Sequence, residues 1–276
     1  MTRICGVGDN VVDRYLGTGL MYPGGSAANV AVHARRLGGD AGYIGILGDD
    51  DAAAHVLKAL LDEDVEVSRV RYEPHPNSFA DVTLDADGNR VFGEFVPPVG
   101  RIELDDEDLA YLRGCDWVHT GHSSFTLPEV PKLSSVAPVV FDFSYKDLEW
   151  AAPVLPHVTA AFFSRGEWDD DECLALVEQV RAHGPSVVVV TRGARGSLVW
   201  REGDGVHLQP AAPARPIDTL GAGDAYLAAM LCALGTDRTL DVAAAEAAAY
   251  AARVCEHFGA FGHPVPIHQP NEEATR

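Results

Sequence analysis

The sequence has 276 residues, of which 47% are hydrophobic and 22% are charged, a composition typical of a globular protein. Its formal net charge of −20 excludes a nucleic-acid partner, because binding to phosphates depends on basic side chains. No apolar run is long enough to span a bilayer, and the first residues lack the apolar segment of a signal peptide. The five cysteines are scattered and form no CxxC pair, as is usual in a reducing compartment. We therefore expect a cytoplasmic protein without a membrane partner.

Short apolar segments alternate with helical patterns along the whole chain. Apolar runs of this length are typical of parallel strands that are covered on both faces. The alternation predicts an α/β fold with a doubly wound, mostly parallel sheet. The predicted strands cover 3–9, 41–48, 115–121, 138–144, 159–164 and 185–191, and the predicted helices cover 26–39, 49–65, 171–183, 222–234 and 239–257.

Residues 78–96 break this rhythm, because they alternate between apolar and polar residues, turn at Asp87-Gly88 and alternate again. This pattern predicts a β-hairpin. Its place before the sheet resumes favours a small lid over a site, and a simple extension of the sheet is the alternative. The residues after 262 are rich in proline and polar side chains, so we expect a single domain at 1–262 and a flexible tail at 263–276.

The segment DTLGAGD at 218–224 places two carboxylates around a glycine turn, just before an apolar helix. Ligands of doubly wound sheets bind where strands end and helices begin. Gly221, Ala222 and Gly223 have little side-chain bulk, so a phosphoryl group can approach their amides and the positive end of the helix. A carboxylate beside such an anion site favours a base that accepts a proton from an attacking hydroxyl, and Asp224 is the candidate. The alternative is that Asp224 only caps the helix.

A second polar group lies near the N-terminus, in the segment GGSAANVAV at 24–32. Asn29 is embedded in an otherwise apolar helix, where a buried amide costs free energy unless it has partners. The glycine pair Gly24-Gly25 allows a polyol to come close to the backbone, and Asn29 can bond a hydroxyl as donor or acceptor. Asp9 and Asp13 follow the first predicted strand, at the edge of the sheet where ligands bind. These residues predict a site for a sugar-like molecule.

The two segments together resemble the two signatures of the ribokinase (PfkB) family of carbohydrate kinases. Residues 24–29 resemble the first signature and residues 218–224 the second, in the family's order. The similarity extends over about residues 3–262. It implies a ribokinase-like fold in which the hairpin at 78–96 is the lid. It also implies that the chain transfers the γ-phosphate of ATP to a hydroxyl of a sugar.

The resemblance further implies roles for individual residues. Asp224 would act as the catalytic base, and Gly221, Ala222 and Gly223 would form the anion hole. Asp218 resembles the edge of the family's monovalent-cation site, which adds K⁺ as an optional cofactor beside ATP and Mg²⁺. The remaining implied contacts are with the sugar, through Asp13, Gly24, Gly25 and Asn29, and with the nucleotide, through Thr191, Gly193 and Gly196.

The sequence departs from the family pattern in two places. Where the family often has an Asn-x-x-Glu motif that organises magnesium and phosphate, this chain has Ser164 in the first position and Glu167 in the last. Glu167 would still hold Mg²⁺ through water, and Ser164 would lie at the nucleotide. Only ten residues separate Asp13 from Gly24, fewer than many relatives use for lid strands. This predicts a reduced lid and leaves open whether the protein is a monomer or a homodimer.

Further segments, among them GDNVVDRY, NRVFGEF, DWVH and FDFS, resemble the family members that phosphorylate fructosamines such as fructoselysine on the 6-hydroxyl. Such a substrate joins a ketose to lysine, so it carries an amine and a carboxylate beyond the sugar. Asp9 and Glu94 are candidates for binding the cationic part, and Arg90 for binding the carboxylate. A surface pair between Arg90 and Glu94 is the alternative. His119, at the end of a predicted strand, is a candidate substrate contact, with a buried core histidine as the alternative.

Two other functions remain compatible with the residues. The first is a kinase for another substrate, namely fructose, 2-keto-3-deoxygluconate, ribose or a nucleoside. The second is a non-catalytic sugar sensor on the same fold, although a sensor has no use for a base beside an anion hole. The sequence contains neither a GxxxxGK[ST] phosphate loop nor the GxSxG turn of a serine hydrolase.

Overall fold

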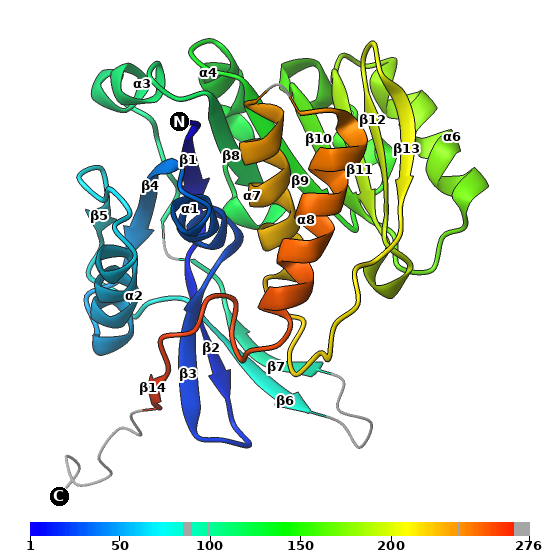
Figure 1. Cartoon of the computed structure of the whole chain (residues 1–276). Coiled ribbons are helices and arrows are strands. Elements are labelled where there is room, and N and C mark those ends of the chain that lie inside the picture. The colour runs from blue at the N-terminus through cyan, green and yellow to red at the C-terminus, as the bar shows by residue number, and fades with distance from the viewer. Residues whose placement is uncertain (85–89, 99, 237, 268–276) are drawn as a thin grey trace, which may run out of the picture.

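Figure 1 shows a computed structural model of the chain, which describes all residues except 85–89, 99, 237 and 268–276. A large sheet with helices on both faces forms the main body, and a smaller sheet projects from one end of it. The architecture is the α/β fold that the sequence predicts. Within the described residues, no helix has both the length and the apolar character needed to cross a membrane.

The large sheet has nine strands in the order β13-β12-β11-β10-β9-β8-β1-β4-β5. All neighbours from β11 to β5 pair parallel, whereas β12 pairs antiparallel with both β11 and β13. The six predicted strands are confirmed, and β5, β12 and β13 are additions that the sequence pattern missed. The strands are β1 Arg3–Gly8, β4 Asp40–Leu47, β5 Arg71–Tyr72, β8 Trp117–Gly121, β9 Val139–Ser144, β10 Ala160–Ser164, β11 Val187–Thr191, β12 Ser197–Arg201 and β13 Gly205–Gln209.

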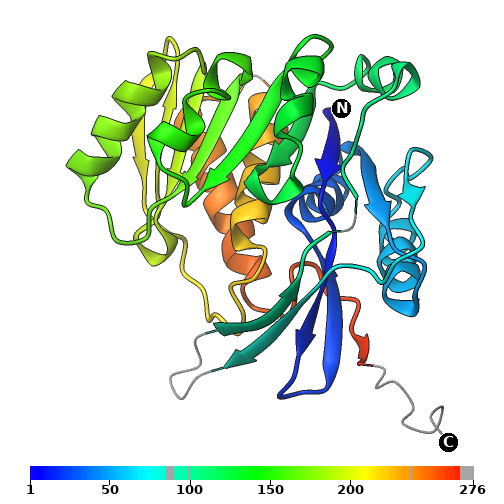
Figure 2. The ribbon, with the colours of Figure 1, turned by 180° about the vertical axis from the view of Figure 1, so that it is seen from behind.

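Helices cover the two faces of this sheet, as Figures 1 and 2 show from opposite sides. Alternate residues of a strand point to opposite faces, so each face packs against its own set of helices. One hydrophobic cluster joins the sheet to α1 Ser26–Arg36, α2 Asp51–Asp62, α7 Ala222–Leu234 and α8 Leu240–Val254. The other cluster joins it to α3 Asp106–Leu112, α4 Val130–Ser134, α5 Leu148–Ala151 and α6 Asp170–Arg181.

The smaller sheet, here called the lid sheet, has five strands in the order β14-β3-β2-β6-β7. The predicted hairpin is present as the antiparallel pair β6 and β7, and its predicted turn at Asp87-Gly88 lies outside the described residues. The short segment that predicted a reduced lid itself forms β2 and β3, so the hairpin does not stand alone. Part of the predicted tail, β14, pairs with β3. The strands are β2 Val11–Tyr15, β3 Leu20–Gly24, β6 Phe79–Leu84, β7 Arg90–Val96 and β14 Val265–Pro266.

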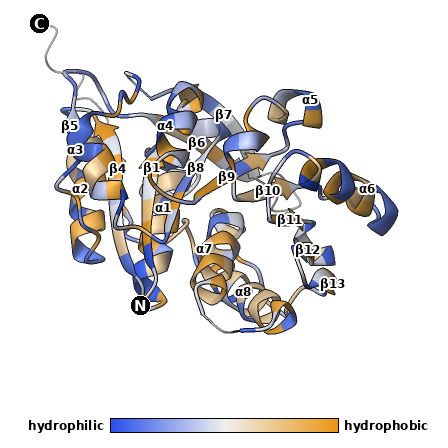
Figure 3. Ribbon diagram, turned by 90° about the horizontal axis from the view of Figure 1, so that it is seen from above, coloured by the Kyte–Doolittle hydropathy of each residue, from blue (hydrophilic) through white to orange (hydrophobic). Residues whose placement is uncertain are grey.

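Local sequence explains where several helices begin and which are buried. Asp50 precedes α2 and accepts a hydrogen bond from the Ala53 amide at 2.9 Å. Asp169 caps α6 by accepting a hydrogen bond from the Glu172 amide, and the Glu172 carboxylate accepts one from the Asp169 amide. In contrast, α7 is apolar on all sides, and Figure 3 shows it as a hydrophobic element beside the sheet. A helix of this kind is stable only inside the protein, which fixes α7 between α1, α8 and the sheet.

Candidate active site

The two signature segments meet where the central strands end and α1 and α7 begin. Ser26, in the first turn of α1, donates from Oγ to Asp224 Oδ1 at 2.7 Å. Asn29, one turn later, donates from Nδ2 to Asp224 Oδ2 at 2.7 Å. The helices therefore bring residues from the two ends of the chain into one polar site.

Asp224 is the third residue of α7, so its side chain lies beside the positive end of an apolar helix. Burial raises the pKa of Asp224 to about 7; the hydrogen bond from Asn29 opposes this, and the negative charge of Asp142 adds to it. A carboxylate with this pKa is ionised in about half of the molecules near neutral pH, so it can accept a proton and later release it. The geometry is that of a general base.

The loop before α7 needs glycine for two different reasons. Gly221 has a φ of 71°, and a Cβ there would lie 2.5 Å from the Ala260 Cβ. A Cβ on Gly223, in contrast, would meet no atom within 4 Å. Gly221 is thus required by the fold, whereas Gly223 leaves open space at the helix N-terminus, where an anion can approach the amides.

Asp9 follows β1, as the sequence predicts, and its carboxylate is occupied by protein donors. It accepts hydrogen bonds from the Ser26 amide at 2.9 Å and the Ala27 amide at 3.3 Å, which are orphan donors at the start of α1. The hydroxyls of Ser123 and Ser124 also donate to it, at 3.2 and 2.6 Å. Asp9 therefore holds the start of α1 against the 122–124 turn.

Asp13 does not lie at the end of the first strand, and this part of the prediction is wrong, because β1 ends at Gly8 and Asp13 belongs to β2 of the lid sheet. Gly24 and Gly25, at the junction of β3 and α1, have no side chains, so Asp13 and Asn10 can lie close to their backbone. A Cβ on Gly24 would lie 2.5 Å from Asp13 Oδ2, and one on Gly25, whose φ is 102°, would lie 2.5 Å from the Asn10 Cα. The pair thus positions a lid carboxylate beside the start of α1.

Asn29 is 4% exposed, and its Oδ1 has no hydrogen-bond partner in the part of the chain that the structure describes. Buried polar atoms are nearly always paired, and an orphan acceptor in a site indicates a group that arrives with the ligand. A sugar hydroxyl is a donor of the right size. Asn29 can thus hold a hydroxyl with Oδ1 while Nδ2 holds Asp224.

His119 lies on β8 and has no exposed surface; its Nε2 is 3.1 Å from Ser26 Oγ. Burial lowers the pKa of His119 to about 4, so the ring is neutral at pH 7. Ser26 has one hydroxyl proton and gives it to the ionised Asp224, so His119 donates from Nε2 to Ser26 Oγ. The role of His119 as a substrate contact stays a prediction; its observed link to the site runs through Ser26.

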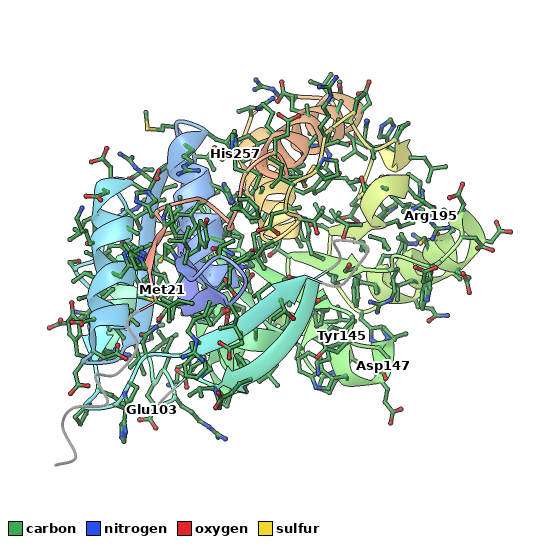
Figure 4. All side chains as sticks on the ribbon, turned by 90° about the horizontal axis from the view of Figure 1, so that it is seen from below. Met21, Glu103, Tyr145, Asp147, Arg195 and His257 are labelled. Atoms are coloured by element: carbon green, nitrogen blue, oxygen red, sulfur yellow. The ribbon has the colours of Figure 1, made fainter. Side chains whose placement is uncertain are left out.

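On the lid sheet, Glu94 is exposed and lies 3.9 Å from the Arg14 guanidinium, which also pairs with Asp81 at 2.6 Å. The side chain of Arg90 lies outside the described part of the chain, so its predicted contact with a substrate carboxylate stays a prediction, as does the alternative pair with Glu94. Figure 4, viewed from the lid side, shows β6 and β7 between the labelled Met21 on one side and Tyr145 on the other. The lid sheet therefore covers the end of the main sheet where the site lies.

A cavity of about 630 Å³ adjoins the start of α7 on the side away from α1. Four of the five residues predicted to bind the nucleotide line it, whereas the fifth, Glu167, is exposed and lies outside this lining. The wall is built mainly from small residues, which leave room for a flat ring and give close access to backbone groups. The lining includes Ser164, Thr191, Gly193, Gly196, Ala211, Ala212, Pro213, Ala214, Thr219, Ala222, Gly223, Ala248, Ala251, Ala252 and Cys255.

Asp142, near the end of β9, lies close enough to Asp224 for its charge to raise the pKa of that residue, and the sequence reasoning missed it. Its Oδ1 accepts a hydrogen bond from the Ser144 amide at 2.7 Å, and burial together with the charge of Asp9 raises the pKa of Asp142 to about 6. Asp142 lies two residues after Val140, so both point to the same face of the large sheet. Val140 belongs to the hydrophobic cluster that packs against α1 and α7. The signal was present as an aspartate that interrupts the apolar run VVFDF.

Two observations bear on metal ions. Within the described residues, no group of three or more His, Cys, Asp or Glu side chains is arranged to hold a metal. Mg²⁺ in phosphate-transfer sites is bound mainly by phosphate oxygens and waters with one or two carboxylates, which Asp142 and Glu167 can supply. Asp218, predicted to bind a monovalent cation, accepts hydrogen bonds from the Tyr15 hydroxyl and the Gly259 and Leu220 amides, and its role at a cation stays a prediction.

The polar site around Asp224 and the adjoining cavity of about 630 Å³ suit the transfer of a group between two ligands, and comparison with known proteins identifies the class of protein. The description "pfkB family carbohydrate kinase" matches residues 8–267, and the chain belongs to this family. It is an ATP-dependent carbohydrate kinase, as the sequence predicted.

Among its relatives, the chain is 39% identical to "Fructosamine kinase FrlD" of Bacillus subtilis over 269 residues, covering 96% of this chain and 94% of the relative. It is 34% identical to "Fructoselysine 6-kinase" of Escherichia coli, covering 95% and 100%. The fold is similar to that of Arabidopsis thaliana ribokinase in complex with ribose and ATP, with a TM-score of 0.79 at 21% identity and 94% coverage of both chains. The ribokinase-like fold is thus confirmed.

Proposed function

We propose that this kinase phosphorylates a fructosamine, with fructoselysine as the preferred substrate and the 6-hydroxyl as the acceptor. The curated relatives named above support the substrate class, since they are fructosamine and fructoselysine kinases in name and cover nearly the whole chain. The observation that carries the proposal is the position of Asp224, between the sugar-side groups Ser26 and Asn29 and the cavity that begins at Gly223.

In the proposed reaction, the sugar binds between α1 and the lid sheet. Asn29 Oδ1 accepts a hydrogen bond from a sugar hydroxyl, and Asp13 binds a second one. Asp224 takes the proton of the attacking hydroxyl, with Ser26 fixing its other oxygen. The sugar oxygen forms a bond to the γ-phosphorus as the bond from that phosphorus to the β–γ bridging oxygen breaks and ADP leaves. The amides of Ala222 and Gly223 stabilise the negative charge that grows on the transferred group. The hydrogen bonds of Ser26 and Asn29 to Asp224 and the unpaired Oδ1 of Asn29 among the described residues support this proposal.

Magnesium enters this scheme with the nucleotide. A hydrated Mg²⁺ would neutralise the charge of the phosphates when bound, and Asp142 and Glu167 are the residues that would hold its waters. Asp142 fits this role because it lies near Asp224 and, among the described residues, its carboxylate accepts a hydrogen bond from the Ser144 amide alone. No lysine or arginine forms an ion pair with Asp142 among the described residues.

The electrostatics of the site favour an aminated sugar over a neutral one. The charge of Asp9 raises the pKa of both Asp142 and Asp224, the charge of Asp142 also raises the pKa of Asp224, and the chain as a whole carries a net charge of −20. A field of this sign attracts the ammonium group that links the sugar to lysine in a fructosamine. The same carboxylates favour release of the phosphorylated product, because they repel its added negative charge.

The cellular setting follows from the substrates. ATP and a reducing environment for the five free cysteines both fit the cytoplasm, where we expect the protein to act as a monomer or homodimer. These are parts of the proposal that localisation and solution-mass measurements would test directly.

The decisive experiment measures ADP release with fructoselysine, fructose, 2-keto-3-deoxygluconate, ribose and adenosine under the same conditions. We expect fructoselysine to have a kcat/KM about tenfold or more above any other substrate. A higher value for fructose would replace the proposed substrate by a neutral ketose. Sugar binding without ADP release for every compound would support the sensor function instead.

A further inference from the structure

Asp218 stands at the start of the loop that leads to the anion hole, and its carboxylate is 6% exposed. Oδ1 accepts a hydrogen bond from the Leu220 amide at 2.9 Å. Oδ2 accepts two hydrogen bonds, one from the Gly259 amide at 2.9 Å and one from the hydroxyl of Tyr15. The three donors come from three segments: the anion-hole loop, the loop after α8 and strand β2 of the lid sheet.

This donor set does not suit a cation on Oδ2. Hard cations in proteins are held by oxygen lone pairs from carboxylates, carbonyls, hydroxyls and water. Around Oδ2 of Asp218, an N–H and an O–H present their hydrogens, which carry partial positive charge and occupy the lone pairs of that oxygen. Hydrogen bonds to an ionised carboxylate are short and strong, so they satisfy the charge of Asp218 without a metal.

Contacts of the Tyr15 ring keep its hydroxyl at Asp218 Oδ2. Its ring makes edge-on contacts with Tyr22 at 5.1 Å and with Phe258 at 6.1 Å between centroids. Tyr15 and Tyr22 also pack with Val82 of the lid sheet and with Leu220 of the anion-hole loop in a small hydrophobic cluster. The lid sheet and the anion-hole loop are thus joined by an apolar contact as well as by the hydrogen bond.

We propose that the Tyr15 hydroxyl takes the place of a monovalent cation at Asp218, and that Tyr15 is a positioning residue that couples the lid sheet to the anion hole. The inference rests on the proposed kinase function for its catalytic consequence. Two effects follow. Phosphoryl transfer by the wild-type protein does not depend on K⁺, and loss of the Tyr15 hydroxyl loosens the loop that carries Gly221 to Gly223.

The test compares the wild type with Tyr15→Phe, which keeps the ring in its cluster and removes only the donor. Tyr22→Phe is the matched control, because it removes a hydroxyl from the neighbouring ring that is not one of the three donors to Asp218 described above. Each protein is assayed for turnover in K⁺, in Na⁺ and in tetramethylammonium at equal ionic strength, and its melting temperature is measured in the same three salts.

We expect wild type and Tyr22→Phe to have the same kcat in all three salts, within about twofold, and melting temperatures that K⁺ does not raise. Tyr15→Phe should lose about tenfold or more in kcat in tetramethylammonium, the value of a hydrogen bond to a charged group, with a smaller change in KM for the sugar. K⁺ should restore part of that loss, since removal of the hydroxyl frees a lone pair of Oδ2.

Either of two results would overturn the inference: activation of the wild type by K⁺ of more than about fivefold together with a rise in its melting temperature, or a Tyr15→Phe protein that matches the wild type in every salt. The melting temperatures can be measured whether or not the protein turns over a substrate. A wild-type protein that releases no ADP with any sugar would therefore disprove the proposed function, while the effect of K⁺ on its melting temperature would still decide the role of Tyr15.

Discussion

The proposed active site has a sugar end and a nucleotide end, which are built from opposite kinds of residue. At the sugar end, Asp9, Ser26, Asn29 and Asp224 form a connected set of hydrogen bonds between α1, α7 and the strand ends. At the nucleotide end, a cavity of about 630 Å³ is lined mainly by glycine, alanine and proline, whose side chains offer shape and few polar groups.

This difference corresponds to what each ligand requires. A sugar is recognised by the direction of its hydroxyl groups, so its partners must be held in place before it binds. A nucleotide offers a flat ring and phosphates, which small residues and backbone amides can accommodate without directed side chains. Substitutions at the sugar end should therefore alter proton transfer and its pH dependence, and those at the nucleotide end should alter the use of ATP.

The largest effect is expected for Asp224→Asn, which removes the base at the sugar end. Turnover should fall by about 10² to 10⁴-fold while both ligands still bind, because the amide cannot accept the proton. Since burial raises the pKa of Asp224 to about 7, its ionisation costs stability as the pH rises through that value, so the variant should melt higher at pH 8. Kinetics and thermal melting at pH 8 check both expectations.

Asp241→Asn is the matched control, because Asp241 is exposed in the first turn of α8, far from the sugar-end hydrogen bonds. It should leave turnover unchanged. Near-normal turnover in Asp224→Asn would mean that the sugar end only binds its ligand. It would contradict the role of Asp224 as the base.

The next effect is expected at the nucleotide end, for Gly223→Ala. A methyl group there meets no protein atom within 4 Å, and alanine favours the helix, so the fold should be at least as stable. The methyl would keep a phosphate away from the amides, and kcat/KM for ATP should fall by about 10²-fold with little change in sugar affinity. Steady-state kinetics with each substrate varied in turn, together with thermal melting, measure this. An equal loss for both ligands would show that the two ends are not separate.

Asp142→Asn tests the residue that lies between the two ends. The Mg²⁺ concentration for half-maximal rate should rise about tenfold, as for other residues that hold metal-bound waters. Loss of its charge should lower the pKa of Asp224, so the acid limb of the pH profile of kcat/KM should move to lower pH. Glu149→Gln, an exposed change on α5, is the control. A rise in the KM for fructoselysine with unchanged Mg²⁺ dependence would instead assign Asp142 to the sugar end.

The smallest effect is expected for Ser26→Ala, which removes one hydrogen bond to the base. Because the bond from Ser26 lowers the pKa of Asp224, its loss should move the acid limb to higher pH, opposite to Asp142→Asn. Turnover at pH 6 should fall by about threefold to tenfold and recover at pH 8. Ser135→Ala, at an exposed position after α4, should leave the profile unchanged. A shift to lower pH would contradict the direction of the bond.

Much of the fold could be predicted because its signals are local. The apolar run VVVV of β11 and the helical patterns of α1 and α7 reflect burial on one or both faces, which repeats within a few residues. The strands β2, β3 and β14 escaped prediction because the lid sheet depends on distant pairings. Besides the local pair of β2 with β3, β2 pairs with β6 and β3 pairs with β14.

The sequence by itself determined the α/β class and the two signatures, and it pointed to Asp224 as the candidate base and to the small residues of the cavity, because each depends on residue type and short spacing. The tertiary structure alone decided that Asp9 caps α1, that Asp142 enters the site and that Tyr15 reaches Asp218. These contacts join segments far apart in the chain, and their hydrogen bonds form only once the helices and the lid sheet have packed at fixed distances.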